Sequence, residues 1–229
     1  AKPEVKKHPL IVFSHGSGGN PANLSWIASR LARAGFVVAM PVHQGTTSSD
    51  STPEQTLRVW ERSDDISALL DRLLSSPSTN SLIDENNVTA MGFSLGGFTA
   101  LSLVGVRAQA APLAQYCDQH PENSTCIWFD RGTAGIKGHA DLHLIDVTRF
   151  QASATDKRFT RFVAIDPAFT NTFEAQSLAE VNVPGLIVSM GEGSDVPEMV
   201  RADRLHKLMP RVKFEPVPGA NHFSFLAEC

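Results

Sequence analysis

The chain contains several short and nearly continuous apolar runs, each bounded by glycine, proline or polar residues. Runs of this length that are rich in Val, Ile and Phe predict strands rather than helices. Because they lack the alternation of a strand with one face in water, they predict strands buried on both faces, as in a parallel sheet. These runs lie at 8–16, 36–42, 88–93, 161–169, 183–191 and 212–218.

Segments with apolar residues at helical spacing separate most of these runs. The first, 23–35, ends at Gly35, a residue suited to a helix C-cap. The longest, 54–76, is expected to form one amphipathic helix that polar residues at 63–65 interrupt. Two further helices are predicted from Leu95 to about Val106 and over 196–209.

Strands that alternate with helices require crossover connections and therefore a parallel sheet. We predict one α/β domain over 1–229, with a mostly parallel sheet of about six strands and flanking helices. The segment 107–158 lacks clear periodicity and does not fit this alternation. Long interruptions of compact domains are usually functional, so we expect 107–158 to be a cap or lid-like insertion.

Composition narrows the possible classes of protein. The 229 residues carry a formal net charge of −4, with 42% apolar and 19% charged residues, as in an ordinary globular domain. No basic run is present, which argues against a nucleic-acid partner. No apolar run reaches the roughly 18 residues that a membrane span needs, so no membrane span is expected.

Two of the three cysteines, Cys117 and Cys126, lie nine residues apart in a polar stretch without metal-binding spacing. We expect them to form a disulfide, although two reduced thiols in a loop are the alternative. A disulfide favours an oxidising compartment, so a periplasmic or secreted location is preferred to the cytoplasm. The chain begins with Ala1 and shows no signal peptide, as a processed form would.

The stretch VTAMGFSLGGFTAL, residues 88–101, places Ser94 among three glycines between a predicted strand and a predicted helix. A G-x-S-x-G sequence by itself is a weak signal. Following a strand and opening a helix, however, it matches the nucleophile elbow, in which a strained turn exposes the serine hydroxyl. We therefore predict that Ser94 is a catalytic nucleophile rather than part of an ordinary turn.

A serine hydroxyl becomes a good nucleophile only when a base accepts its proton. Of the eight histidines, His222 follows the last predicted strand and so lies where open α/β sheets build their sites. We predict that it is the base. The H-x-D-x-H sequence at 139–143 is a candidate metal site but lacks an evident third ligand, so a solvated loop is preferred. His8, His43, His120 and His206 are expected in loops or on helix surfaces.

The base also needs a carboxylate that orients it. Asp166 ends the fourth predicted strand, and Asp195 follows the fifth. Loops from neighbouring strands can reach one imidazole, so spacing alone leaves both open. Asp195 directly precedes Val-Pro-Glu, where it is suited to cap a helix, so we favour Asp166.

Attack on a carbonyl requires hydrogen-bond donors for the oxyanion that forms. The backbone N–H of Leu95, next to the nucleophile, is the first predicted donor. The glycine-rich loop SHGSGGN after the first strand is expected to supply the second, the N–H of Ser17. The alternative for this loop, phosphate binding, is disfavoured because no Gly-Lys-Ser/Thr follows it.

The chain resembles the α/β-hydrolases, in particular the platelet-activating-factor acetylhydrolases and bacterial predicted dienelactone hydrolases. The resemblance implies Ser94 as nucleophile, His222 as base, Asp166 as acid, and Ser17 and Leu95 as oxyanion donors, in an esterase that needs no metal or other cofactor. Phe93 departs from the histidine of many relatives, and the first two strands of their usual sheet are missing. The segments that carry the resemblance are PLIVFSHGSGG, LARAGFVVAMPVHQG, GFSLGGFTAL, FVAIDPAF and GANHFSFL.

These residues together predict a serine carboxylic-ester hydrolase that works through an acyl-enzyme on small-molecule esters with short or medium acyl groups. Phe93, Phe169 and Phe223, with Leu95, are expected to line the substrate pocket, although each would serve equally well in the core. Lipase, amidase, peptidase or acyltransferase activity on the same residues, and a catalytically silent binding protein, are the alternatives.

Overall fold

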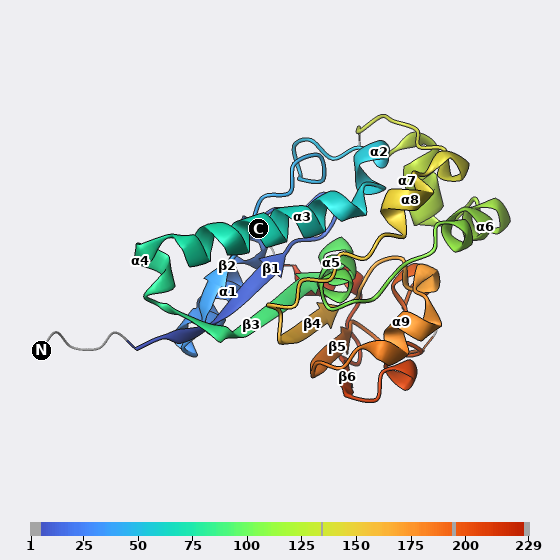
Figure 1. Ribbon diagram of the computed structural model, residues 1–229. Helices are drawn as coiled ribbons and strands as arrows, with labels where there is room; N and C mark the ends of the chain where they lie inside the picture. The colour runs from blue at the N-terminus through green and yellow to red at the C-terminus, as the bar shows by residue number, and fades with distance from the viewer. Residues whose placement is uncertain (1–5, 134, 194–195, 227–229) are drawn as a thin grey trace, which may run out of the picture.

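The computed structural model describes residues 6–133, 135–193 and 196–226. Six strands form one parallel sheet in the order β2-β1-β3-β4-β5-β6 (Figure 1). The predicted fold class is therefore confirmed, as are all six predicted strands. They are β1 (His8–Ser14), β2 (Val37–Ala39), β3 (Ile83–Phe93), β4 (Arg161–Ile165), β5 (Gly185–Ser189) and β6 (Val212–Pro216).

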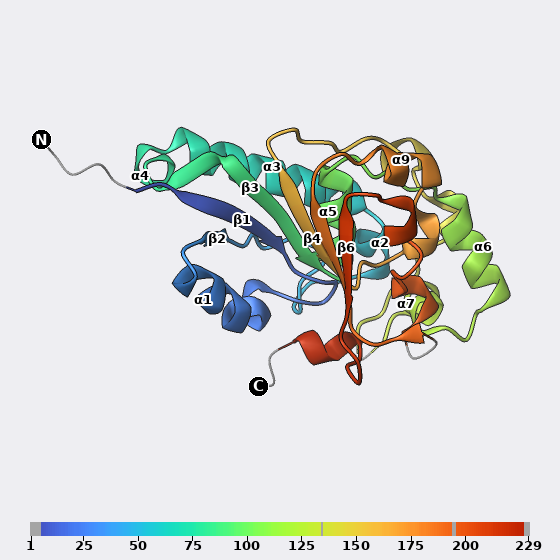
Figure 2. The ribbon, with the colours of Figure 1, turned by 90° about the horizontal axis from the view of Figure 1, so that it is seen from below.

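Helices cover both faces of the sheet. Figure 2 shows α3, α4, α5 and α9 on one side of the strands, and α1 with the C-terminal turn on the other. The helices are α1 (Ser25–Arg33), α2 (Pro53–Thr56), α3 (Val59–Ser75), α4 (Pro77–Asn80), α5 (Leu95–Leu103), α6 (Ala111–Gln119), α7 (Ser124–Arg131), α8 (Val147–Phe150) and α9 (Ala175–Glu180).

The continuous apolar runs are explained by burial on both faces of the sheet. In β1, Leu10 and Val12 pack with Ile66 of α3 in the larger core cluster. The alternate residues Ile11 and Phe13 point to the other face and pack in a separate cluster. A strand in this position cannot place a polar residue on either face without burying it.

Strand β3 begins five residues earlier than the apolar run that predicted it, because it starts at Ile83. Its first half, IDENN, is polar and partly exposed, yet Ile83 and Asp84 pair with His8 and Pro9 of β1. Pairing with β1 therefore resumes beyond the polar residues 85–87, at Ile83, which is buried in the larger core cluster. The interruption by polar residues hid this extension from the apolar pattern.

Two helix predictions are wrong in detail. The segment 54–76 breaks between α2 and α3, at Leu57 and Arg58, whereas 63–65 lie inside α3. The helix predicted over 196–209 is absent; the described residues form two 3-10 turns there, Glu198–Val200 and His206–Leu208. Arg201 is extended and ends the first turn, so the buried apolar side chains of this segment pack without a continuous helix.

The segment 107–158 forms α6, α7, a 3-10 turn at Leu142–Leu144 and α8. These elements lie beyond the carboxyl ends of the strands (Figure 2). A disulfide joins Cys117 of α6 to Cys126 of α7, which confirms the predicted pairing. Phe129 of α7 and Phe150 of α8 pack in a third core cluster. The insertion is therefore part of the packed structure and not a loose loop.

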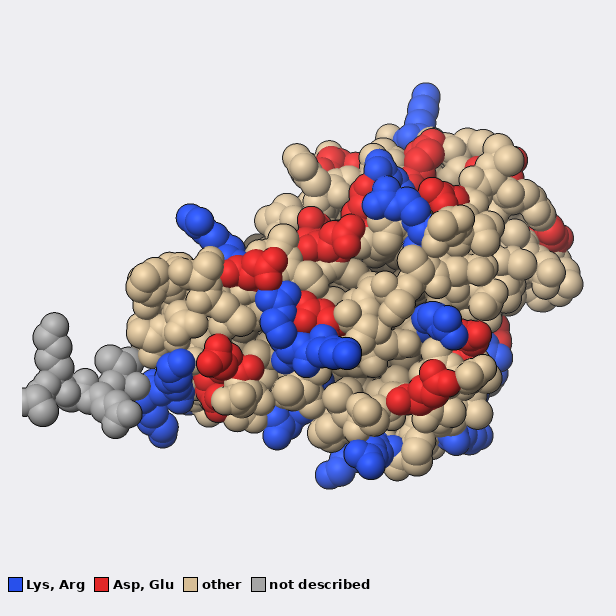
Figure 3. Space-filling view, in the orientation of Figure 1, with Lys and Arg blue, Asp and Glu red and all other residues tan. Residues whose placement is uncertain are grey.

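Charged residues of both signs are interspersed over the face of the molecule in Figure 3, and neither sign forms a large continuous patch there. Several of the charged residues form ion pairs, such as Arg158 with Asp71 and Asp156. Among the residues that the structure describes, no helix has the length and apolar character needed to cross a bilayer.

Candidate active site

Ser94 lies at the turn between β3 and α5, with a backbone φ of 54° and ψ of −118°. A positive φ in a residue other than glycine stores about 1–3 kcal/mol of strain, which the surrounding hydrogen bonds must hold in place. Here the Ser94 N–H donates to the Ile165 carbonyl, and the Ser94 carbonyl accepts from Phe98 and Ala168. The turn is thus fixed on both sides, as the predicted nucleophile elbow requires.

The three glycines around this serine are explained by close approaches of backbone. A Cβ on Gly92 would collide with the Gly96 carbonyl, and a Cβ on Gly96 would collide with the Ser14 carbonyl of β1. On Gly97 it would come within 2.9 Å of the Pro167 Cα. Since the colliding atoms are backbone, side chains at these positions would force strand and helix apart.

His222 begins the C-terminal 3-10 turn, which Asn221 caps with its side chain. Its Nε2 lies 3.1 Å from the Ser94 Oγ, and its Nδ1 lies 3.0 Å from the Asp166 Oδ2. The imidazole is stacked on the ring of Phe93, with centroids 4.7 Å apart. This aromatic surface fixes the plane of the His222 ring between its two partners.

Asp166 follows β4 and is fully buried, with a positive φ of 40°. Its Oδ2 faces His222, and its Oδ1 accepts a hydrogen bond of 2.7 Å from the Met190 N–H. The Asp166 N–H donates to the Val188 carbonyl of β5. Both carboxylate oxygens therefore have partners. The alternative acid, Asp195, lies outside the described residues.

The two predicted oxyanion donors flank the serine. The Leu95 N–H belongs to the first turn of α5, where N–H groups have no partner within the helix. On the other side, Gly16 lies so close that a Cβ there would be 3.2 Å from the Ser94 Cβ. Ser17 follows directly, and both Ser17 and Leu95 line the cavity above the serine. Their donor role stays a prediction.

A cavity of about 550 Å³ opens over the serine. Phe169 is buried in its wall, with a left-handed backbone, whereas Phe223 is 71% exposed and borders the cavity on the side of the solvent. All predicted pocket residues belong to the lining. The predicted site residues that line it are Ser17, Phe93, Ser94, Leu95, Phe169, His222 and Phe223.

Several lining residues were not predicted. The insertion contributes Trp128 and Phe129 from α7, and the turn after β5 contributes Met199 and Val200. The Trp128 Nε1–H donates to the Thr56 Oγ1 over 3.1 Å, which links the insertion to α2. The unusual length of 107–158 pointed to a covering role, but nothing in its sequence indicated which aromatic residues line the cavity.

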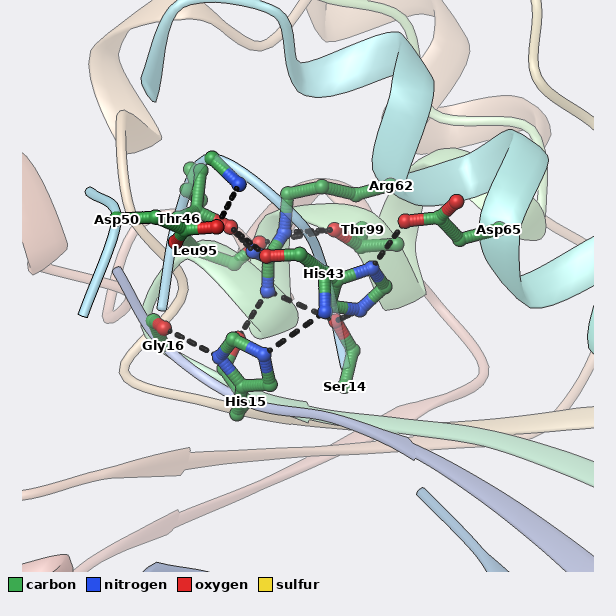
Figure 4. A network of polar contacts seen from close by, with 11 residues as sticks. Ser14, His15, Gly16, His43, Thr46, Asp50, Arg62, Asp65, Leu95 and Thr99 are labelled. Atoms are coloured by element: carbon green, nitrogen blue, oxygen red, sulfur yellow. Dashed lines mark hydrogen bonds and ion pairs between the residues drawn. The ribbon is translucent and has the colours of Figure 1, made fainter. Parts of the chain in front are cut away.

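A second group of polar residues lies beneath the loop after β1 (Figure 4). His8, expected in a loop or on a helix surface, instead begins β1. His43, for which the same was expected, does lie in the loop after β2 but is fully buried there. Its Nδ1 lies 2.8 Å from the Asp65 Oδ2, and its Nε2 lies 2.9 Å from the Ser14 Oγ. This order of groups resembles a catalytic triad, but Ser14 is 1% exposed and does not border the cavity. We therefore assign it a structural role.

Arg62 of α3 is buried at the centre of this network, and its guanidinium donates to the Ser14 Oγ over 3.1 Å and to the His15 carbonyl. Burial, reinforced by the charge of Arg62, lowers the pKa of His15 to about 3 and that of His43 to about 2. Burial also lowers the pKa of Arg62, to about 9, and raises that of Asp65. Near neutral pH both imidazoles are therefore uncharged and the guanidinium keeps its proton.

The residues of the candidate metal sequence at 139–143 have other partners. His139 contacts the Asp130 carbonyl, Asp141 caps the turn that follows it, and His143 faces Asp118. Over the described ranges, no three His, Cys, Asp or Glu side chains are grouped as a metal ion would require.

A parallel sheet with helices on both faces, a serine at a strand-to-helix turn and a histidine after the last strand define an α/β hydrolase. The family model described as the alpha/beta hydrolase family matches residues 11–228, and the chain belongs to this family.

Two curated proteins are similar to part of this chain. The chain is 33% identical over 99 residues to the uncharacterized protein YcjY of Escherichia coli K12, which covers 42% of this chain and 31% of that protein. It is 30% identical over 106 residues to cutinase 2 of Thermobifida cellulosilytica, and this match covers 45% of this chain and 37% of the cutinase. In each case the part of the chain that matches spans about a third of the length of the curated relative.

The ferulic acid esterase from Streptomyces cinnamoneus has a similar structure, with a TM-score of 0.60 and 20% sequence identity. The match covers 99% of this chain and 55% of the esterase. At this identity the likeness concerns the fold alone.

Proposed function

We propose that this chain is a serine carboxylic-ester hydrolase that uses Ser94 as nucleophile, His222 as general base and acid, and Asp166 as the orienting carboxylate. The observation that carries the proposal is the continuous contact from Ser94 through His222 to the buried Asp166. Hydroxyl, imidazole and carboxylate joined in this order are the arrangement that activates serine for acyl transfer.

In the first half of the reaction, His222 Nε2 takes the proton from Ser94 Oγ while Oγ attacks the ester carbonyl. The oxyanion that develops accepts hydrogen bonds from the N–H groups of Leu95 and Ser17. The imidazolium, held by Asp166, then gives its proton to the leaving alkoxide as the bond from carbonyl carbon to alkoxy oxygen breaks. The alcohol departs and an acyl-enzyme remains.

In the second half, the same steps run in reverse, with water in the place of the alcohol. His222 takes a proton from the water, whose oxygen attacks the acyl carbonyl. The second tetrahedral intermediate collapses, the bond to Ser94 Oγ breaks, and the serine recovers its proton from the imidazolium. The net reaction is one ester and one water giving one acid and one alcohol.

The size of the cavity favours small esters as substrates. About 550 Å³ accommodates a short or medium acyl group with a modest alcohol. Apolar side chains from α5, α7 and the turn after β5 form much of its wall, and we propose that the insertion 107–158 acts as its cap. Among the similar proteins, one is named a cutinase and one a ferulic acid esterase. The narrower resemblance to platelet-activating-factor acetylhydrolases and dienelactone hydrolases stays a prediction.

Hydrolysis of p-nitrophenyl esters from acetate to decanoate, with labelling by a fluorophosphonate, tests the proposal. Ser94→Ala should lose the label and reduce kcat by about four orders of magnitude or more. Ser102→Ala is the matched control, since Ser102 is a buried serine of α5, the helix that follows Ser94, and does not border the cavity. Equal labelling of wild type and Ser94→Ala would show that the nucleophile is another residue.

A further inference from the structure

The loop that carries Ser17 is anchored to buried side chains through two of its own carbonyl groups, which belong to successive residues. The His15 carbonyl accepts from the Arg62 guanidinium, and the Gly16 carbonyl accepts from the imidazole of His15 over 2.7 Å (Figure 4). Arg62 is itself fixed by the hydroxyls of Thr46 and Thr99. The base of the loop therefore rests on a rigid, buried arrangement.

The hydrogen bonds of His15 determine its tautomer. Its Nε2 lies 3.2 Å from the backbone N–H of His43, which can only donate, so this nitrogen is an acceptor without a proton. In a neutral imidazole the proton is then on Nδ1. The His15 Nδ1–H is consequently the donor to the Gly16 carbonyl.

Holding the Gly16 carbonyl also fixes the direction of the Ser17 N–H. Both groups belong to one planar trans peptide unit, in which C=O and N–H point in opposite directions. A second donor, the Gly19 N–H at 3.2 Å, acts on the same carbonyl. With the carbonyl directed toward His15, the Ser17 N–H is directed away from it, and the loop lies against Ser94.

We propose that His15 is a positioning residue, whose Nδ1–H fixes the Gly16–Ser17 peptide so that the Ser17 N–H is aimed at the oxyanion before substrate binds. This inference rests on the proposed function, because it assigns a purpose to one of the two predicted oxyanion donors. A donor that is already aimed stabilises the transition state without the cost of reorganising during the reaction. His15 itself transfers no proton to the substrate.

Two variants separate the hydrogen bonds of the His15 ring. In His15→Asn, the side-chain NH₂ takes the place of Nδ1 and still donates to the Gly16 carbonyl, but the His43 N–H loses its partner. In His15→Gln, the longer side chain brings an oxygen to the place of Nε2, which still accepts from His43, but the donor to Gly16 is lost. Gln also fills the buried volume better than Asn does.

The two variants should therefore rank in opposite orders for stability and turnover. We expect His15→Asn to have the lower Tm, with kcat for p-nitrophenyl butyrate within about threefold of wild type. We expect His15→Gln to keep the higher Tm but to lose about 10- to 100-fold in kcat, less than or comparable to the loss of a whole oxyanion donor, with KM within about threefold. The rate of fluorophosphonate labelling should follow kcat.

A kcat that falls equally in both variants, or that follows Tm, would overturn the positioning role. Ser14→Ala is the control for damage to the buried network, because it removes a partner of Arg62 and leaves the carbonyls of residues 15 and 16 bound. It should lower Tm and leave kcat within about threefold. If Ser94→Ala is inactive while His15→Gln turns over like wild type, only the positioning role is wrong. If Ser94→Ala stays active, the proposed function itself is wrong.

Discussion

The buried pair His15 and His43 should make the protein unstable in mild acid. In the folded state both imidazoles stay neutral, because burial and the nearby Arg62 charge lower their pKa to about 3 and about 2. In the unfolded chain both should titrate near the ordinary pKa of about 6.5. Between these values the unfolded state binds more protons than the folded state, so the free energy of unfolding decreases as the pH falls.

The magnitude follows from the shift in pKa. Each pKa unit corresponds to about 1.4 kcal/mol, so lowering the pH from 7 to 5 should cost about 2 kcal/mol per histidine and about 4 kcal/mol for the pair. A single domain is typically stable by only about 5–15 kcal/mol, so this loss is a large fraction. Asp65 acts in the opposite sense, because burial raises its pKa and the folded state then binds its proton more readily than the unfolded state does. Its effect on the free energy of unfolding is confined mainly to the acidic end of this pH range.

Urea unfolding at pH 7, 6 and 5, followed by circular dichroism, measures this effect. His43→Gln keeps an acceptor for Ser14 but cannot titrate, so it should remove about half of the pH dependence even though it lowers stability at pH 7. The exposed His120, replaced by Gln, is the control and should leave the dependence unchanged. A wild-type free energy of unfolding that stays constant from pH 7 to 5 would refute the reasoning.

Three further results are expected. Asp166→Asn should reduce kcat by about 10³- to 10⁴-fold, since the amide cannot stabilise the imidazolium, while circular dichroism shows an intact fold. Gly96→Ala should express as misfolded protein or lose several kcal/mol in urea unfolding, because its Cβ meets the Ser14 carbonyl; a variant as stable as wild type would contradict the observed packing. Alkylation without reductant should leave Cys117 and Cys126 unmodified when their peptides are analysed by mass spectrometry, and an added group on each of these two residues would exclude the disulfide.

The sequence was most informative where burial and chain geometry act locally. Strands buried on both faces need continuous apolar runs, so all six were found, and the collision of backbone atoms around Ser94 requires the glycines that marked it. The choice of Asp166 as the acid has a local reason too, because Asp166 ends a predicted strand whereas Asp195 precedes Val-Pro-Glu and is suited to cap a helix. The structure brings it to 3.0 Å from His222.

The features that sequence missed depend on contacts between distant segments. Within their own segments, His43 and Arg62 look like surface residues. They are buried in the structure because β1 and α5 supply side-chain oxygen atoms, such as those of Ser14 and Thr99, that bind their polar groups. Most apolar side chains of 196–209 are buried, Leu208 being an exception, but their helical spacing did not reveal the backbone that carries them. Periodicity reports the direction of side chains, and separate turns can satisfy it as well as a helix does.

The position of the buried acid has a consequence for how this scaffold can change. Because Asp166 follows β4, Pro197, Met199 and Val200 after β5 shape the cavity without touching the reacting groups, whereas Met190, directly after β5, holds the acid through its N–H. Substitutions there can reshape the binding surface while the reacting groups keep their geometry. Part of the cavity wall is thus encoded by residues that the reacting groups do not contact, so that natural or directed evolution can alter selectivity there and preserve the chemistry.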